Sequence, residues 1–338
     1  MEFIDRVEEL RKLEEGLKRG ESFVIVAPRR YGKTTLIRKV LRELEDKKFL
    51  TLYIDLMPYA DSVSALSKHI FNRTLDLLGI EGKIRKLSHL FQIKGKAVLK
   101  EEGIEINLEV FKGTDEREML REALELPEKI ASRKGRRMVV AFDEFGEIYK
   151  TNPQAVKLFR SVIQHHEHTS YIFAGSQETI MKKVFMDKDG VFFRFGTLVE
   201  LGGLELKDTL EYAVDNLGVP ADEFVEMFKL LKGHPYYLAR VMEKVRSGKE
   251  ILNALEELVE EEKAYIELLV ERVLSMKHAL EVLRAIAREK NPYEVLEVKD
   301  QVVNRTLNKL ISYGYLRRVG RGVYEFTDPL LELYLKER

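Results

Sequence analysis

The segment FVIVAPRRYGKTTL, from Phe23 to Leu36, decides the fold of this 338-residue chain. Its first four residues are apolar, as in a short buried strand, and the residues from Lys33 onward have the apolar spacing of a helix. The loop between them ends in Gly-Lys-Thr. Strand, loop and helix in this order are the layout of a phosphate-binding loop, so the segment predicts that the chain binds a nucleotide.

The chemistry of the loop supports this prediction. The usual pattern is Gly, four residues, then Gly-Lys-Ser/Thr, and Ala27 stands in the place of the first glycine. Backbone N–H groups can surround phosphate oxygens here, Lys33 would reach the β- and γ-phosphates, and the Thr34 hydroxyl would bind Mg²⁺. Arg29 and Arg30 are either phosphate contacts or solvated loop residues. The candidate nucleotide contacts of the loop are Ala27, Pro28, Arg29, Arg30, Tyr31, Gly32, Lys33, Thr34 and Thr35.

A second segment, MVVAFDEF from Met138 to Phe145, predicts that the nucleotide is hydrolysed as well as bound. Five apolar residues form a buried strand, and Asp143 and Glu144 follow at its carboxyl end. In open α/β sheets this end faces the ligand crevice. Asp143 would hold Mg²⁺, and Glu144 would polarise the water that attacks the γ-phosphate. The alternative is a carboxylate pair that only caps the next helix.

Strand and helix patterns alternate through the first 200 residues. Short apolar strands are also expected at 49–54, 171–174 and 198–201, with helices between them. This alternation predicts an α/β fold with a parallel sheet that helices cover on both faces. Residues 91–113 alternate apolar and polar side chains on either side of a Glu-Glu-Gly turn. They predict an inserted β-hairpin, either decorative or a partner-binding arm.

The sequence predicts three domains. Residues 1–203 would form the nucleotide-binding core, and 204–274 contain amphipathic helices that would form a lid over it. Residues 275–338 predict a helix, a turn, a second helix and a two-stranded hairpin that turns at residues 320–322. This order is typical of a winged-helix domain.

A winged-helix domain suggests duplex DNA as a partner. Residues 300–313 would be the recognition helix, and the hairpin would place arginines near phosphates. From Lys277 onward the chain has 12 basic and 9 acidic residues, which is a weak electrostatic footprint for DNA. Domains of this type also bind proteins, which is the alternative. The candidate DNA contacts are Asn304, Arg305, Asn308, Lys309, Arg317, Arg318 and Arg321.

Composition excludes several classes of protein. The formal net charge is zero, so the chain has no overall basic field that would attract nucleic acid. Cysteine is absent, which excludes disulfides, thiolate metal sites and cysteine nucleophiles. We expect a cytoplasmic protein without membrane contact, because neither a secretory signal nor a membrane-length apolar run is visible. Charged residues reach 34% and Trp is absent, a balance typical of heat-adapted proteins.

Seven segments carry a resemblance to a known family: FIDRVEELRKL, APRRYGKTTL, VVAFDEF, YIFAGSQ, FFRFG, GHPYYL and GYLRRVGRGVYEFTDPLLELYL. The chain resembles the archaeal P-loop ATPases near the junction of the AAA+ and STAND groups, which are distant relatives of the archaeal origin-recognition initiators. The resemblance covers nearly the whole chain. It implies an ASCE/AAA+-like P-loop NTPase core that binds ATP or ADP with Mg²⁺, an all-α lid and a C-terminal winged helix.

The same resemblance implies roles for residues outside the two motifs. Asp5 and Arg6 correspond to a segment that packs near adenine. Ser176 corresponds to a polar sensor of the γ-phosphate or the attacking water; the alternative is a strand-end cap. Arg194 corresponds to an arginine finger, acting in cis or on a neighbouring subunit, or is a surface residue. The lid motif that touches the nucleotide corresponds to Gly233, His234 and Pro235.

Two positions depart from the family's pattern. Ala27 replaces the first glycine of the loop, which affects the fine geometry around the phosphates. Asp55 stands where several relatives have an Asn that restrains the catalytic Glu. An ionised carboxylate cannot donate that hydrogen bond, so the coupling of partner binding to hydrolysis is expected to differ.

The expected function is a slow, Mg²⁺-dependent ATPase that acts as a molecular switch, with a lid and winged helix that respond to the nucleotide. Thr34 and Asp143 would bind the metal. The alternative is a DNA-binding initiator or regulator in which the nucleotide is structural and turnover is negligible. A scaffold that forms an oligomer on binding ATP is a third hypothesis. The expected catalytic residues are Lys33, Glu144, Ser176 and Arg194.

Overall fold

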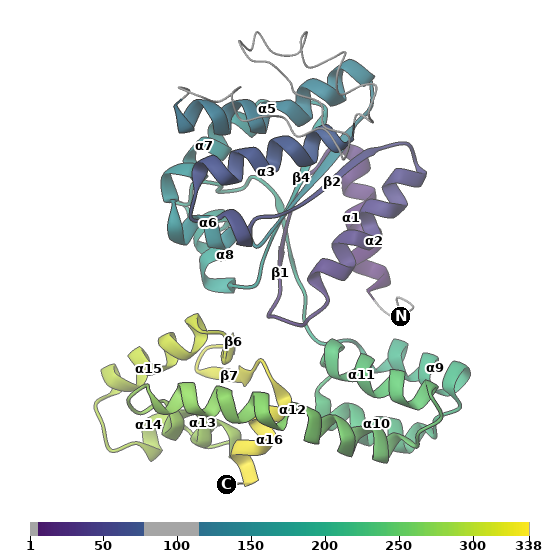
Figure 1. Ribbon diagram of the computed structural model, residues 1–338. Coiled ribbons are helices and arrows are strands. Elements are labelled where there is room, and N and C mark those ends of the chain that lie inside the picture. The colour runs from purple at the N-terminus through teal and green to yellow at the C-terminus, as the bar shows by residue number, and fades with distance from the viewer. Residues whose placement is uncertain (1–5, 78–114, 338) are drawn as a thin grey trace.

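The computed structural model describes residues 6–77 and 115–337, and a parallel sheet lies at the centre of the N-terminal part (Figure 1). Asp5 and the hairpin predicted at 91–113 lie outside the described residues. The sheet has five strands in the order β2-β3-β4-β1-β5, and every neighbouring pair is parallel, which confirms the predicted α/β fold. The strands are β1 (Phe23–Val26), β2 (Leu50–Asp55), β3 (Met138–Asp143), β4 (Thr169–Gly175) and β5 (Thr197–Glu200).

Helices cover both faces of this sheet (Figure 1). Successive strand residues point to opposite faces, so Ile25 and Ala141 pack with the first layer and Val26 and Phe142 with the second. The first layer consists of α1 (Val7–Arg19) and α2 (Lys33–Asp46). The second consists of α3 (Val63–Asp76), α5 (Glu116–Lys134), α6 (Phe145–Thr151), α7 (Pro153–Ile163) and α8 (Glu178–Phe185), with the short 3₁₀ helix η1 (Met57–Tyr59) after β2.

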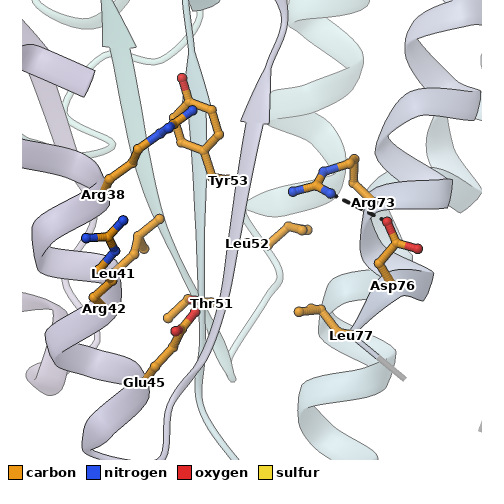
Figure 2. Close-up of a pocket in the computed structure, with 10 residues that line it drawn as sticks. All are labelled: Arg38, Leu41, Arg42, Glu45, Thr51, Leu52, Tyr53, Arg73, Asp76 and Leu77. Atoms are coloured by element: carbon orange, nitrogen blue, oxygen red, sulfur yellow. Dashed lines mark hydrogen bonds and ion pairs between the residues drawn. The ribbon is translucent and has the colours of Figure 1, made fainter. Parts of the chain in front are cut away.

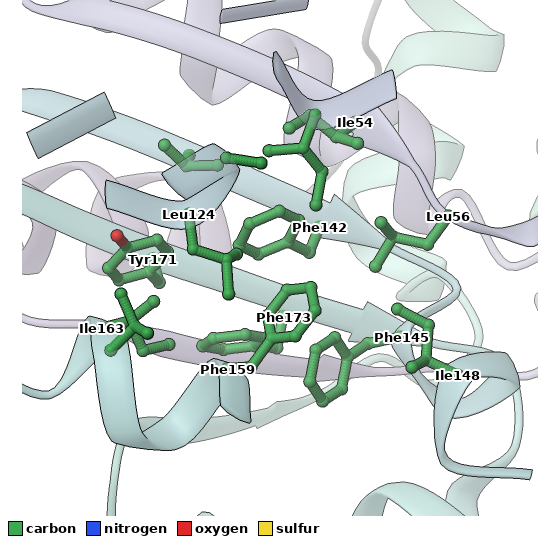
Figure 3. Close-up of a cluster of buried hydrophobic side chains, with 14 of the residues drawn as sticks. Ile54, Leu56, Leu124, Phe142, Phe145, Ile148, Phe159, Ile163, Tyr171 and Phe173 are labelled. Atoms are coloured by element: carbon green, nitrogen blue, oxygen red, sulfur yellow. The ribbon is translucent and has the colours of Figure 1, made fainter. Parts of the chain in front are cut away.

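An aromatic cluster fills the space between the sheet and the second layer (Figure 3). The ring of Phe142 lies 5.3 Å from that of Phe159, and the ring of Phe145 lies 4.8 Å from that of Phe173. All four side chains are almost completely buried. Because Phe142 and Phe145 flank Asp143 and Glu144 in the sequence, this close-packed cluster fixes the backbone that carries the two carboxylates.

The C-terminal part is mainly helical. Its buried side chains form one continuous cluster, from Ala213 to Leu335, and α12 contributes to it along most of its length. The domain boundary expected at 274/275 stays a prediction. The elements are α9 (Leu206–Leu217), α10 (Ala221–Leu231), α11 (Pro235–Arg246), α12 (Ile251–Leu274), α13 (Ala279–Ala287), α14 (Pro292–Val295), α15 (Asp300–Ser312), β6 (Leu316–Gly320), β7 (Val323–Phe326) and α16 (Pro329–Glu337).

The last elements follow the order expected from the sequence. Strands β6 and β7 form an antiparallel hairpin in which Arg317 lies opposite Glu325. Gly322 has a φ of 76°, a left-handed conformation that glycine adopts at little cost, and so it allows the tight turn. Helix α15 precedes the hairpin directly. Among the helices of the described ranges, none combines the length and apolarity needed to cross a membrane.

Candidate active site

The phosphate loop predicted from the sequence joins β1 to α2. Gly32 has a φ of 79°, and an added Cβ there would meet nothing within 4 Å. Glycine is therefore favoured at this position because of its backbone conformation, and not because a side chain would lack space. Ala27 is buried at the end of β1, where a small side chain suffices. Helix α2 begins at Lys33, so the loop ends at a helix N-terminus, which favours anions.

Lys33 connects the loop to the end of β3. Its ammonium lies 2.7 Å from Glu144 Oε1 and 3.1 Å from Asp143 Oδ1. The lysine side chain is 7% exposed, so its charge lies in a largely dry environment. A buried ammonium needs compensating charge, which the two carboxylates supply. The structure thus brings Lys33 together with two adjacent carboxylates that lie more than a hundred positions away in the sequence.

Asp143 is the most enclosed carboxylate of the site. Its Oδ2 accepts hydrogen bonds from the Thr34 hydroxyl at 2.7 Å and from the Tyr53 hydroxyl at 2.8 Å. Burial would raise the pKa of Asp143, but the Lys33 ammonium and the two hydroxyl groups outweigh it and hold the pKa below its ordinary value. Asp143 is therefore ionised at neutral pH.

Glu144 has an unusual backbone conformation. Its φ is 54°, in the left-handed region that non-glycine residues adopt only at some cost. Its Oε1 accepts a hydrogen bond from the Lys33 ammonium, and its Oε2 accepts one from the Ser176 hydroxyl at 2.9 Å. Ser176 directly follows β4, so two neighbouring strands hold this carboxylate in place.

The oxygen atoms around Asp143 fit a magnesium ion. Mg²⁺ prefers hard oxygen ligands and is usually held by one or two protein groups, with water and phosphate completing the octahedron. The Thr34 hydroxyl and the ionised Asp143 carboxylate are such a pair, 2.7 Å apart. Within residues 6–77 and 115–337, no group of three or more His, Asp or Glu side chains could hold a metal by itself.

The lid motif lies against the phosphate loop. His234 is 2% exposed, and its ring meets that of Tyr31 edge-on at 4.8 Å. Burial and the nearby Arg30 cation lower the pKa of His234 to about 3, so its imidazole is neutral. Gly233 has a φ of 68°, and an added Cβ would lie 2.5 Å from the Leu204 carbonyl oxygen. Pro235 is the first residue of α11.

Arg6 supports the loop from the other side. Its guanidinium donates to the carbonyl oxygens of Gly202 at 2.6 Å and Tyr31 at 3.3 Å. This arginine therefore ties the segment before α1 to the phosphate loop and to the chain beyond β5. The proposed contact of Arg6 with adenine stays a prediction.

Arg194 lies at the opposite end of the sheet from the phosphate loop. It lines a cavity of about 440 Å³ together with Ser22, Tyr171 and Thr197, at the amino ends of β1, β4 and β5. The loop follows the carboxyl end of β1, and four strand residues span about 13 Å. This position does not fit an arginine finger acting in cis, because the side chain is too short to cover the distance.

Three other expectations concern side chains near the site. Asp55 accepts a hydrogen bond from the Met57 backbone at 3.0 Å, which is a turn-stabilising contact. Arg29 and Thr35 are exposed. Arg30 points to a carboxylate of α12, a contact that the sequence did not predict.

Tyr53 is a residue of the site that the sequence reasoning missed. It belongs to β2 and is one of the side chains that line a second cavity, of about 340 Å³ (Figure 2). The Arg38 guanidinium lies 5.0 Å from the centre of the Tyr53 ring. The sequence offered one signal, a tyrosine hydroxyl in a largely apolar strand. Only the pairing of β2 with β3 in the structure shows that this hydroxyl bonds Asp143.

The candidate DNA contacts are only partly available for a ligand. Arg317 donates two hydrogen bonds to Glu325, at 3.0 and 2.7 Å, and Asn304 accepts one from the Tyr293 hydroxyl at 2.7 Å. Arg318 donates to the Gly320 carbonyl oxygen at 3.1 Å. The remaining four candidates are exposed: Arg305, Asn308, Lys309 and Arg321.

Comparisons with known proteins agree with this geometry. The model of a family described as an ATPase domain predominantly from Archaea matches residues 3–241. An uncharacterized protein of Methanocaldococcus jannaschii is 28% identical over 107 residues, which cover 30% of this chain and 24% of that protein. The chain thus spans about a quarter of the length of this relative.

Two solved structures have a similar fold over nearly the whole chain. A Walker-type ATPase of Pyrococcus abyssi gives a TM-score of 0.72 at 21% identity, over 99% of this chain and 96% of that one. The ORC2 protein of Aeropyrum pernix, in ADPNP–ADP complexes, gives a TM-score of 0.57 at 14% identity, over 98% and 92% of the two chains. The likeness therefore includes the C-terminal part as well as the sheet.

Proposed function

Because the chain belongs to the family of ATPase domains found predominantly in Archaea, we propose that it is a Mg²⁺-dependent ATPase that works as a nucleotide-driven switch. The observation that carries the proposal is the convergence of one ammonium, two carboxylates and two hydroxyl groups at the carboxyl ends of β1, β3 and β4. This is the edge of an α/β sheet where ligands bind.

Each residue has a role that its contacts support. Lys33 would turn from the carboxylates to the β- and γ-phosphates and neutralise their charge. Thr34 and Asp143 would hold Mg²⁺, which supplies further positive charge to the phosphate oxygens. Glu144 would accept a hydrogen bond from the attacking water, and Ser176 would keep the Glu144 carboxylate in the required orientation. The oxygen of this water would form a bond to the γ-phosphorus as the phosphoanhydride bond from that phosphorus to the β–γ bridging oxygen breaks, with ADP as the leaving group.

The switch requires parts that move relative to one another. We propose a core up to residue 203, a helical lid at 204–274 and a winged-helix domain from 275 onward. The contact of Tyr31 with His234 supports this proposal, since it joins a residue of the phosphate loop to a residue of the proposed lid. A nucleotide in the loop would change this contact and so shift the helical parts.

The test is a comparison of Glu144→Gln with Glu147→Gln in steady-state ATP hydrolysis at elevated temperature. Glu144→Gln is expected to keep ATP binding, measured by calorimetry, and to lower turnover by at least about tenfold. Glu147 lies one helical turn further on and bonds Gln177, so Glu147→Gln controls for the loss of a nearby carboxylate. Unchanged turnover in Glu144→Gln would refute the catalytic assignment.

The same assay tests whether a neighbouring subunit completes the site. Arg194 is exposed and far from its own phosphate loop, so we propose that it can act only on another subunit. Turnover per chain should then rise with protein concentration, and Arg194→Ala should remove this rise. Turnover that is independent of concentration and of Arg194 would exclude the role in trans and weaken the proposal of a nucleotide-dependent oligomer.

A second candidate function is duplex binding with a structural nucleotide. It is favoured by the exposed polar face of α15 and by Arg321 at the tip of the hairpin. The triple variant Arg305→Ala, Lys309→Ala and Arg321→Ala should lose salt-sensitive duplex binding, measured by fluorescence anisotropy across a salt series. Wild-type protein that binds no duplex at low salt would end this hypothesis and leave a protein as the partner of the C-terminal part.

A further inference from the structure

Arg30 of the phosphate loop contacts three side chains from the C-terminal helical part, although 34% of its own side chain stays exposed. Its guanidinium donates a 2.9 Å hydrogen bond to Glu262 Oε2. The centres of the Tyr236 and Tyr265 rings each lie 4.4 Å from the guanidinium carbon. We call these four residues the arginine cage. Aromatic faces attract a guanidinium, so the cage holds Arg30 by its charge and by its two flat faces.

Glu262 is buried although it lies on an acidic helix. It is 7% exposed, whereas Glu260, Glu261 and Lys263 beside it are exposed to solvent. Burying a carboxylate is costly unless hydrogen bonds and an opposite charge compensate for it. Arg30 supplies the charge at Oε2, and the Tyr236 hydroxyl donates to Oε1 at 3.0 Å. The only cation that the structure pairs with Glu262 among the described residues therefore comes from the phosphate loop.

The cage also fixes the conformation of the loop. Arg30 has a φ of 67°, which is unfavourable for a residue with a Cβ and persists only where the surroundings enforce it. The next residue is bound to the helical part as well, since the Tyr31 hydroxyl donates to the Thr327 carbonyl oxygen at 3.1 Å. Two consecutive loop residues thus connect the loop to α12 and to the segment that precedes α16.

We propose that Glu262 is a positioning residue that holds Arg30 away from the phosphates and latches the helical part onto the core, and that a bound triphosphate competes for this arginine. The inference rests on the proposed function, because it concerns how the nucleotide site is regulated. A guanidinium pairs with phosphate as well as with carboxylate. Transfer of Arg30 to the phosphates would leave Glu262 without its cation, and the latch would open.

The energetic logic predicts opposite effects on ATP binding for the two halves of the pair. A ligand shifts an equilibrium only by its different affinity for the two states. In Glu262→Gln, Arg30 is already released, so ATP binding should tighten by about fivefold or more. In Arg30→Ala the phosphate partner is lost, so ATP binding should weaken. Both variants should open the latch in the nucleotide-free protein.

The experiment measures one distance and one affinity in the full chain. The absence of cysteine allows two labels to be placed cleanly, at Lys12→Cys in α1 and Glu226→Cys in α10, both at exposed positions. Förster transfer between them reports the opening, and calorimetry with ATP in magnesium reports affinity. Glu261→Gln is the matched control, because its carboxylate lies one residue away and pairs with Arg240 and Lys244 of α11.

The outcomes separate this inference from the proposed function. If wild-type protein binds no ATP, the proposed function fails, while the label distance in nucleotide-free Glu262→Gln still tests the latch. If Glu262→Gln and Glu261→Gln give the same distance and the same affinity, the latch is refuted. Affinities that move in the same direction in Glu262→Gln and Arg30→Ala would show a purely structural contact. Tyr236→Phe, which removes one hydroxyl, serves as the milder variant should Glu262→Gln unfold.

Discussion

The hydroxyl of Tyr53 donates a 2.8 Å hydrogen bond to Asp143 Oδ2 and so connects the edge strand β2 to the carboxylate proposed to bind the metal. Parallel pairing of β2 with β3 sets this contact, since Tyr53 lies beside Ala141, two residues before Asp143. Thr34 donates to the same oxygen. The orientation of Asp143 therefore depends on three separate elements.

Tyr53→Phe should weaken the binding of magnesium without preventing folding. The variant removes one of the two hydroxyl donors of Asp143 Oδ2, and the loss of such an outer partner commonly lowers metal affinity by about tenfold. The Mg²⁺ concentration for half-maximal ATP hydrolysis should rise accordingly. Tyr59→Phe is a suitable control, because the Tyr59 ring stacks on His69 and the donors to Asp143 Oδ2 are Thr34 and Tyr53. Identical magnesium curves for both variants would show that Thr34 alone orients the carboxylate.

Ser176→Ala should lower turnover while leaving ATP affinity nearly unchanged. The Ser176 hydroxyl bonds Glu144 Oε2, so its loss frees a carboxylate that is proposed to orient water and not to bind nucleotide. We expect a decrease in kcat of about tenfold or more. Gln177→Ala is the control, since Gln177 bonds Glu147 instead. A selective loss of ATP binding in Ser176→Ala would instead indicate direct contact with the phosphates.

Gly233→Ala should destabilise the lid more than Gly218→Ala. Both glycines have left-handed φ values, 68° and 67°, so each alanine variant loses about 1 kcal/mol of unfolding free energy for conformational reasons. Only the Cβ at 233 would clash with a backbone oxygen, that of Leu204, at 2.5 Å. Denaturant titration gives the unfolding free energy of each variant, and the difference between the two values measures the cost of this clash. Equal losses would mean that the Leu204 carbonyl moves aside freely.

His234 should make the protein less stable in mild acid. Its pKa is about 3 in the folded chain, against 6.5 for an ordinary histidine. Between these two values, His234 is protonated in the unfolded chain and neutral in the folded chain. Stability from this source is complete above about pH 6.5 and decreases as the pH falls toward 3. In His234→Phe this part of the decrease should be absent, as denaturant midpoints at pH 7 and 4.5 would show. His165→Phe, at an exposed position, should keep the wild-type decrease.

The sequence predicted what short segments determine by themselves. Lys33 and Asp143 belong to two motifs whose strands run parallel, and parallel strands present their carboxyl ends at one edge, so their meeting followed from the fold class. The contact of Arg30 with Glu262 joins residues 232 positions apart, and no local pattern distinguishes Glu262 from the other glutamates of α12. The position of Arg194 could not be predicted from the sequence either, because it depends on where the segment before β5 enters the sheet.

The length of α12 gives the arginine cage a mechanical consequence. The helix has 24 residues and is therefore about 36 Å long, and Glu262 lies at its middle. A rotation of about 10° around this point would displace each end of the helix by about 3 Å, in opposite directions. The first half of the helix pairs with α11, through Glu257 and Glu261 with Lys244, and the helix also contacts α13, which follows it in the chain. Helix α12 would thus act as a lever with its fulcrum at the phosphate loop, and a small rotation at the loop would move the packing partners of both halves of the helix.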